Sequence, residues 1–136
     1  MEKATREEKL QRIIESEKML GEIQDVDVLL ERILTEARSI VHADAGSIYV
    51  VDSGNLKIKY AQNDTQLKSL APGDKLPYTF FSFPINEKSI AGYVAYSGQV
   101  LNIDDAYEIP SDKPYKFNQT TDKTTEYRTK SIYTIP

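Results

Sequence analysis

The 136-residue chain contains no cysteine and a single histidine, His42. Without a thiol it cannot form disulfides, thiolate metal sites, iron–sulfur clusters, thioether-linked chromophores or a cysteine nucleophile. One histidine cannot build a catalytic triad or a histidine metal cluster, and we assign His42 to a helix C-terminus, where a cation complements the helix dipole. P-loop, dinucleotide-binding and zinc-protease motifs are also absent. We therefore predict that the chain is not an enzyme.

Excess positive charge and long apolar runs are lacking as well. The chain has 17 Lys and Arg against 21 Asp and Glu, a net charge of −4. It therefore lacks the excess positive charge that attracts nucleic acid or an anionic membrane. Its apolar runs are too short to cross a bilayer, and its charged start does not resemble a secretory signal. With 40% hydrophobic residues, the length suits one domain around one core. We expect a soluble, cytoplasmic domain.

The first predicted element is a separate, charged helix over residues 1–24. Its apolar side chains share one helical face: Leu10, Ile13, Ile14, Leu20 and Ile23. We expect Gly21 to interrupt it. This helix either packs on its own domain or dimerises as a signalling helix, since a coiled coil of a few turns is marginal alone.

A second helix is predicted after the Asp25–Asp27 stretch, where apolar side chains from Leu30 to Val41 recur at three- and four-residue steps. Asp25 or Asp27 is expected to cap it. Arg32, Glu36 and Arg38 are expected on its solvent side.

From Ser47 onward the pattern becomes strand-like. Residues 47–60 alternate apolar and polar side chains around the turn at Ser53–Asn55, which predicts a hairpin. A helix over residues 89–98 begins near Ser89 and stops at Gly98. Short strands are predicted over residues 80–85, 100–103 and 131–135. Helices followed by a hairpin and mixed short elements are typical of an α+β fold with an antiparallel sheet and flanking helices.

Two segments can build a binding site. Ser89, Ile90 and Ala91 place backbone N–H groups at a helix N-terminus, which favours an anionic group such as phosphate. The polar segment of residues 104–129 is too long for an idle connection. Segments of this length usually form a lid or a binding wall, or else are disordered; we call it the lid. Its aromatic rings can stack on a flat ligand or pin the lid to the sheet, and its hydroxyls can bind ring edges. These residues are Tyr107, Tyr115, Phe117, Tyr127, Thr120, Thr121, Thr124 and Thr125.

Two adjacent carboxylates, Asp104 and Asp105, follow a predicted strand. Such a pair can bind a divalent ion or take part in acid–base chemistry. In this place it is more often a helix cap and a solvated charge. A metal hydrolase is therefore the weakest of our hypotheses.

Several stretches together resemble a GAF domain. The last of them, Phe117-Asn118-x-x-x-Asp122-x-x-Thr125-x-Tyr127-Arg128-Thr129-Lys130-Ser131-Ile132, is the most specific. It is similar to the GAF domains of cyclic-nucleotide phosphodiesterases, bacterial cyclases and HD-type hydrolases. The resemblance covers residues 25–136 and also includes Leu30–Ala37, Ala43–Tyr49, Ser89–Ala95 with Gly98, and Leu101–Tyr107.

The resemblance implies a regulatory sensor that binds a small ligand between the sheet and the lid. The ligand would be a cyclic nucleotide (cAMP or cGMP) or another small anionic or purine-like molecule. The residues expected to contact it are Ser89, Ile90, Ala91, Asp105, Phe117, Thr121, Thr125 and Tyr127. Residues 1–24 would form a homodimer and pass the signal to an output domain of a longer protein. The alternative is a ligand-free dimerisation and relay module whose pocket is filled by its own Tyr115 or Phe117.

A set of Asn, Lys, Phe, Asp and Glu braces the lid in this family, and the chain matches it in part. Asn102, Phe117 and Asp122 match, but Asp104 stands at the lysine position and Lys123 stands where an acidic residue is usual. A Lys–Asp brace therefore cannot form from these positions.

Two further departures concern the end of the chain. Glu126 replaces the usual glycine before Tyr127, so we expect its backbone to avoid a positive φ. A GAF domain normally continues past a strand like residues 131–136 into one more strand and a closing helix. We expect either a truncated domain or a partner chain that supplies this strand, since its absence would leave sheet edges unpaired.

Overall fold

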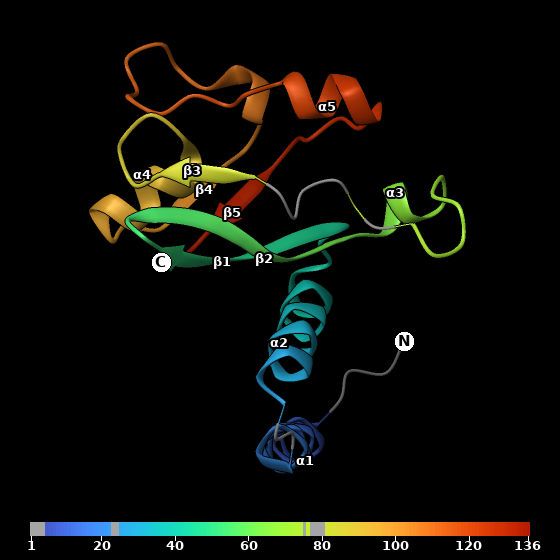
Figure 1. The fold of residues 1–136 in the computed structure, drawn as a ribbon. Helices are drawn as coiled ribbons and strands as arrows, with labels where there is room; N and C mark the ends of the chain where they lie inside the picture. Colours follow the sequence, from blue (N-terminus) through green and yellow to red (C-terminus); the bar gives the residue numbers. More distant parts are fainter. Residues whose placement is uncertain (1–4, 23–24, 75, 77–80) are drawn as a thin grey trace.

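A computed structural model describes residues 5–22, 25–74, 76 and 81–136. The expectations for Ile23 and Phe80, and for the side chain of Leu20, lie outside the described residues. The two helices at the start of the chain lie on one side of a small sheet, and the C-terminal elements lie on its other side (Figure 1). This arrangement confirms the predicted α+β class.

Helix α1 (Arg6–Glu22) begins with a capping box. The Thr5 hydroxyl accepts a hydrogen bond from the Glu8 backbone N–H at 3.2 Å, and the Glu8 carboxylate accepts one from the Thr5 N–H at 2.7 Å. The helix ends at Glu22, one residue after Gly21, where an interruption was expected.

Helix α2 (Val26–Val41) is capped by Asp25, whose carboxylate accepts the Asp27 N–H at 2.9 Å. The predicted cap and the start that it implies are therefore confirmed. His42 ends it in the left-handed conformation, with φ of 54°, and donates its N–H to the Arg38 carbonyl. The Leu34 side chain of this helix is buried against the sheet, next to Gly46.

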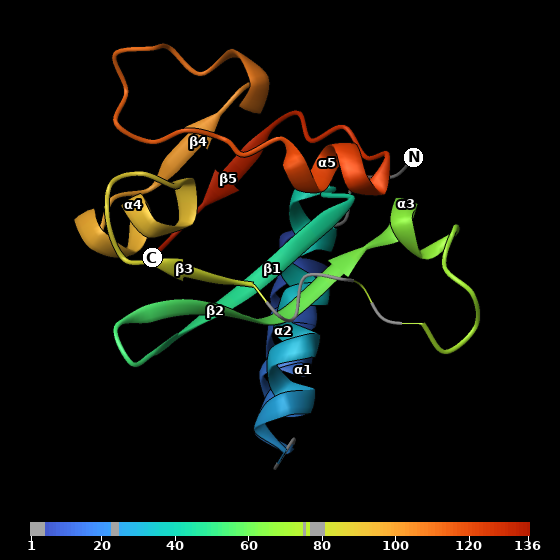
Figure 2. The same cartoon turned by 45° about the horizontal axis from the view of Figure 1, so that its top comes forward.

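The first sheet contains β1 (Ala45–Asp52), β2 (Asn55–Asn63) and β3 (Ser82–Pro84), all antiparallel (Figure 2). The predicted hairpin is confirmed, with an irregularity in register between Ile48 and Tyr49. Leu56 and Ile58 of β2 are buried. The expected strand over residues 80–85 is shorter than predicted.

A second sheet pairs β4 (Leu101–Ile103) with β5 (Ile132–Thr134). The pairing is antiparallel as expected, and no ladder between described strands joins this pair to the hairpin. Helix α4 (Ile90–Ser97) precedes the pair and has the predicted limits, with Ser89 as N-cap and Gly98 as a left-handed C-cap.

Three short elements were not predicted. They are α3 (Asp64–Leu67), η2 (Ala106–Glu108) and α5 (Thr120–Thr125). Single polar side chains set the first two: Asn63 caps α3 and Asp105 caps η2. Such one-turn elements carry no apolar period that a sequence could reveal. Among the described helices, none combines the length and apolar character needed to cross a bilayer.

Candidate functional site

The lid is held together by the carboxylate of Asp122 in α5, which is only 6% exposed. It accepts hydrogen bonds from the Tyr107 hydroxyl at 2.8 Å, the Thr129 N–H at 2.7 Å and the Thr129 hydroxyl at 2.8 Å. A buried carboxylate needs such donors to offset its lost hydration. Burial and the bond to Asp122 raise the pKa of Tyr107. Asp122 therefore fastens the beginning of the lid to its end.

A second clamp joins Asp105 to Arg128. The Arg128 Nη2 donates to both Asp105 carboxylate oxygens at 2.9 Å, and its guanidinium carbon lies 3.6 Å from the Tyr107 ring centroid. The Tyr107 backbone N–H and then Arg128 lower the pKa of Asp105. Residues 104 and 122, both aspartates, form no Lys–Asp brace, whereas Asp105 and Arg128 form this ion pair.

The chain turns back after α5 through Glu126, which adopts φ of 54°. Our expectation that Glu126 avoids a positive φ is therefore wrong. A left-handed residue costs about 1–2 kcal/mol outside glycine. This cost is offset because the N–H groups of Glu126 and Tyr127 both donate hydrogen bonds to the Asp122 carbonyl in this turn.

The N-terminus of α4 is the other predicted part of the site. The Ser89 hydroxyl accepts the Gly92 N–H at 3.0 Å, Ile90 is buried and Ala91 is half-buried. The Lys116 N–H donates to the Lys88 carbonyl at 3.0 Å, which brings this helix end beside the lid.

Of the eight predicted ligand residues, Phe117 and Ile90 meet in the core. Phe117 packs against the cluster of Ile90, Ile103 and Tyr115, and its ring centroid lies 5.7 Å from that of Tyr107. Ser89, Ile90 and Ala91 lie on α4, and Asp105, Thr121, Thr125 and Tyr127 lie on the lid.

Most of the polar groups among these eight residues already have protein partners. Ser89 and Asp105 are paired as described above, the Thr125 hydroxyl donates to the Thr121 carbonyl at 2.7 Å, and the Tyr127 hydroxyl donates to Asp44 at 2.9 Å. The Thr121 hydroxyl has no hydrogen-bond partner within the described part of the chain. It is therefore the polar group of this set that is available to a ligand.

A hollow of about 620 Å³ lies elsewhere, at the C-terminal end of α2. It is lined by Thr35, Arg38, Ser39, His42, Ala43, Asp44 and Asp64. None of these is among the eight predicted residues, although the Tyr127 hydroxyl reaches the Asp44 carboxylate at its edge. Across residues 5–22, 25–74, 76 and 81–136, His, Asp and Glu side chains form no group of three that could hold a metal ion.

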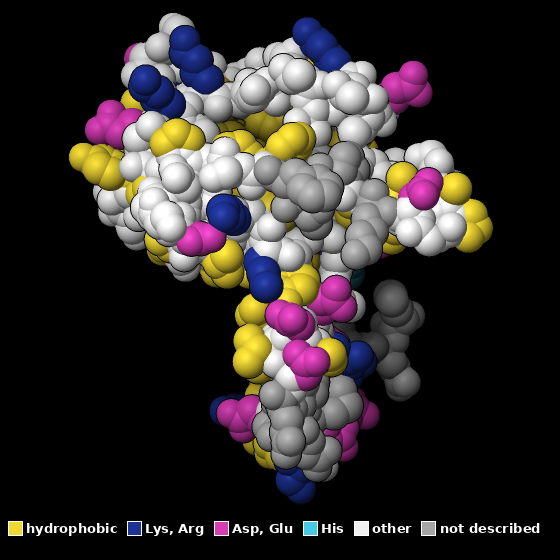
Figure 3. All heavy atoms as spheres, in the orientation of Figure 1, with side chains coloured by type: hydrophobic (Ala, Val, Ile, Leu, Met, Phe, Trp, Pro, Cys, Tyr) yellow, Lys and Arg dark blue, Asp and Glu magenta, His cyan; other side chains and the backbone are white. Residues whose placement is uncertain are grey.

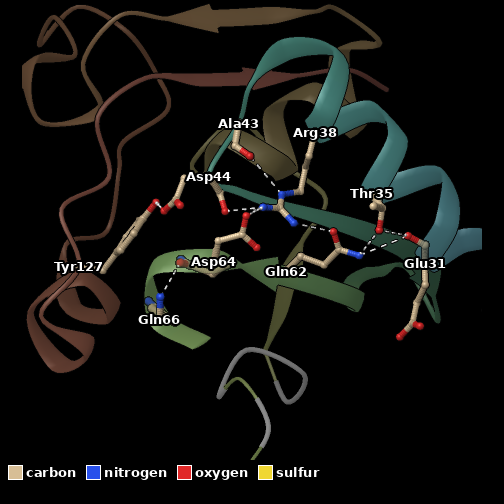
Figure 4. A network of polar contacts seen from close by, with 10 residues as sticks. Glu31, Thr35, Arg38, Ala43, Asp44, Gln62, Asp64, Gln66 and Tyr127 are labelled. Atoms are coloured by element: carbon tan, nitrogen blue, oxygen red, sulfur yellow. Dashed lines mark hydrogen bonds and ion pairs between the residues drawn. The ribbon is translucent and has the colours of Figure 1, made fainter. Parts of the chain in front are cut away.

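Arg38 is the centre of a polar network beside this hollow (Figure 4). Its side chain is 12% exposed and pairs with Asp64 at 2.7 Å, so its predicted solvent-facing position is wrong. The pKa of Asp44 is lowered, first by the Thr65 hydroxyl and then by Tyr127 and Arg38, against an opposing effect of burial. In the sequence, Arg38 lies one helical turn after Leu34 and therefore on the same helix face, and this spacing was the local indication that Arg38 faces inward.

Known proteins resemble the chain over most of its length. The GAF domain family matches residues 25–136. Over 121 residues the chain is 34% identical to the "Probable 3',5'-cyclic phosphodiesterase pde-5" of Caenorhabditis elegans, covering 85% of this chain and 15% of that protein. The chain therefore spans about 15% of the length of this relative. GAF domains are typically regulatory and ligand-binding. On the match over residues 25–136, the chain belongs to the GAF domain family.

Proposed function

We propose that the chain is a sensory domain without catalytic activity of its own, which binds a small anionic or purine-like ligand, foremost cAMP or cGMP. The conformational change caused by ligand binding would be transmitted through α2 and α1 to an output domain. The similarity to a cyclic phosphodiesterase supports this ligand class. The structural support is the lid, because Asp122 makes it one unit that can close over a ligand.

The proposed ligand lies between the lid and the N-terminus of α4. Thr121 offers a hydroxyl without a partner among the described residues, Phe117 and Tyr127 offer rings, and the first turn of α4 favours an anionic group. The Asp105–Arg128 pair closes the lid at an exposed edge. Its contacts can open without unfolding the core.

Thermal unfolding with cAMP, cGMP, 5′-AMP and 5′-GMP tests the sensor. A ligand that binds the folded state should stabilise it by roughly 2.7 kcal/mol at a hundredfold excess over its dissociation constant. We expect one cyclic nucleotide to raise the melting temperature more than its linear counterpart. A cooperative transition that no nucleotide moves would contradict the proposal.

A matched pair of variants locates the site. Thr121→Val removes the available hydroxyl, while Thr124→Val alters a neighbour whose hydroxyl donates to the Thr120 carbonyl of the same helix at 2.9 Å. We expect the first variant to reduce the nucleotide-dependent shift and the second to preserve it. Equal shifts in both variants would place the ligand elsewhere.

A ligand-free relay module is the second candidate. Tyr115 is buried beside Tyr93, with ring centroids 5.0 Å apart, and Phe117 packs on the same cluster. These rings fill the space that a ligand ring could take. This function predicts a cooperative melt insensitive to every nucleotide, with dimerisation intact.

Both candidate functions include a homodimer formed through the N-terminal helices. On α1, Leu10 and Ile13 are exposed. On α2, Val26, Ile33 and Ile40 recur every seven residues, as in a coiled-coil seam, and Val26 and Ile40 are 64% and 77% exposed. Apolar side chains lie between acidic ones along these helices (Figure 3).

Light scattering on the intact chain checks the dimer. Leu10→Glu combined with Ile40→Glu should give the monomer mass, because two charges then enter the apolar seam. Val51→Glu, at an exposed apolar site on β1, should keep the dimer mass. A monomeric wild-type chain would contradict the proposed dimer.

A further inference from the structure

We propose that the hydrogen bond between Tyr127 and Asp44 is the mechanical link through which the lid controls α2. The two residues are 83 positions apart, and the Tyr127 hydroxyl lies 2.9 Å from the Asp44 carboxylate. The inference rests on the proposed function, since it supplies the route by which a ligand under the lid would affect the helix that leads to α1.

On the lid side, Tyr127 is fixed to the centre of the lid. Its N–H donates to the Asp122 carbonyl at 3.0 Å, directly after the left-handed Glu126. The Asp122 side chain is itself held by Tyr107 and Thr129. A movement of the lid therefore moves the Tyr127 hydroxyl with it.

On the other side, Asp44 lies in the turn between α2 and β1 and is tied to the helix. Its carbonyl accepts from Arg38 Nη2 at 2.8 Å and from the Asp64 N–H at 3.0 Å. Arg38 Nε also donates to the Ala43 carbonyl at 3.2 Å. Displacement of this turn thus acts directly on Arg38, in the last turn of α2.

The same network continues along α2 toward its N-terminus (Figure 4). Arg38 Nη1 donates to the Gln62 side chain at 2.8 Å, and Gln62 donates to the Thr35 hydroxyl at 2.9 Å and the Glu31 carbonyl at 3.3 Å. The helix is thereby held at successive turns, at residues 38, 35 and 31.

The side chains of Leu34 and Arg38 pack closely against the start of β1. A Cβ added at Gly46 would lie 2.8 Å from Leu34 Cδ1 and 3.0 Å from Arg38 Cγ. Packed groups of this kind shift together and do not deform gradually. A change of the lid between two conformations would shift the conformational equilibrium of α2 through these contacts. Coupling between two sites requires such an element, whose equilibrium both sites can shift.

Amide hydrogen exchange of the full chain without ligand tests the link. The variants are Tyr127→Phe, Asp44→Ala and their combination. Loss of one such hydrogen bond should accelerate exchange about fivefold. We expect this acceleration in the lid and in residues 31–46 for Tyr127→Phe. Asp44→Ala also removes the acceptor of the Thr65 hydroxyl, so it should accelerate exchange at least as much. The double variant should show no further acceleration in residues 31–46 beyond Asp44→Ala.

Tyr133→Phe is the matched control, because Tyr133 is 63% exposed and its hydroxyl makes no hydrogen bond within the described residues. It should leave both segments unchanged. The link is overturned if Tyr127→Phe affects the lid alone, if the single effects add in residues 31–46, or if Tyr133→Phe acts equally. Because no ligand is used, these results stand apart from the nucleotide melts that decide the sensor.

Discussion

The guanidinium of Arg128 covers the ring of Tyr107, 3.6 Å from its centroid, while Nη2 holds both carboxylate oxygens of Asp105 at 2.9 Å. The Ala106 N–H donates to the Lys130 carbonyl at 2.7 Å in the same region. The two ends of the lid are therefore fastened to each other by charge, stacking and backbone contact. This arrangement lets the lid act as one unit.

Replacing Arg128 should loosen the lid. We expect Arg128→Ala to lower the melting temperature by a few degrees, and Arg128→Lys to restore only part of the loss. An ammonium group cannot match the bidentate geometry or the stacking of a guanidinium. Lys116→Ala, which removes an exposed cation, should have little effect. Full recovery in Arg128→Lys would show that charge alone matters.

Asp122 should be the most costly position in the lid to change. Asp122→Ala removes the acceptor of three hydrogen bonds and leaves Tyr107 and Thr129 unpaired, so we expect a loss of about 3 kcal/mol in the free energy of unfolding. Asp122→Asn should lose less. Urea unfolding measures both, with Lys123→Ala on the exposed side of α5 as control. A loss no greater than that of the control would refute the assigned role.

Acid should weaken the lid through Asp105. Its pKa is lower in the folded chain than in the unfolded one, so its charge stabilises the fold above about pH 4. That contribution is lost as the pH falls through the folded-state pKa. We expect Asp105→Asn to melt at lower temperature than wild type at neutral pH and to approach it in acid. A constant difference across the pH range would argue against this ion pair.

Gly92 should not tolerate a side chain. An added Cβ would lie 2.6 Å from the Pro84 carbonyl oxygen and 2.9 Å from that of Asn86. Because both neighbours are backbone atoms, Gly92→Ala should cost about 1–3 kcal/mol. Ala95→Ser, on the exposed side of the same helix, serves as control in chemical unfolding. A Gly92→Ala variant as stable as this control would show that α4 can shift away from β3.

Elements set by nearby residues could be predicted. Ser89 and Gly98 bound α4 as expected, Asp25 caps α2, and the turn after Asp52 makes the hairpin. In each of these, a side chain or glycine within a few positions decides the backbone conformation. The family pattern around Phe117 and Asp122 also lies within one short stretch of sequence, so it could be recognised from the sequence alone.

Features set by distant residues could not be predicted. Arg38 is drawn inward by carbonyls at 43 and 44 and by Gln62 and Asp64, of which only the first two are near in sequence. The contact between Tyr127 and Asp44 depends on the complete fold. Tertiary hydrogen bonds override local preference at these two places. The left-handed Glu126 was missed for a local reason, because it ends α5, a short helix with no apolar period in the sequence.

Amide exchange of the wild-type chain at saturating cAMP or cGMP tests whether a ligand binds under the lid and acts on α2. We predict slower exchange in the lid and at residues 89–92, together with a change in residues 31–46, for one of the two nucleotides. Protection confined to other parts of the chain, or none with either nucleotide, would contradict a sensor that binds under the lid and signals through α2.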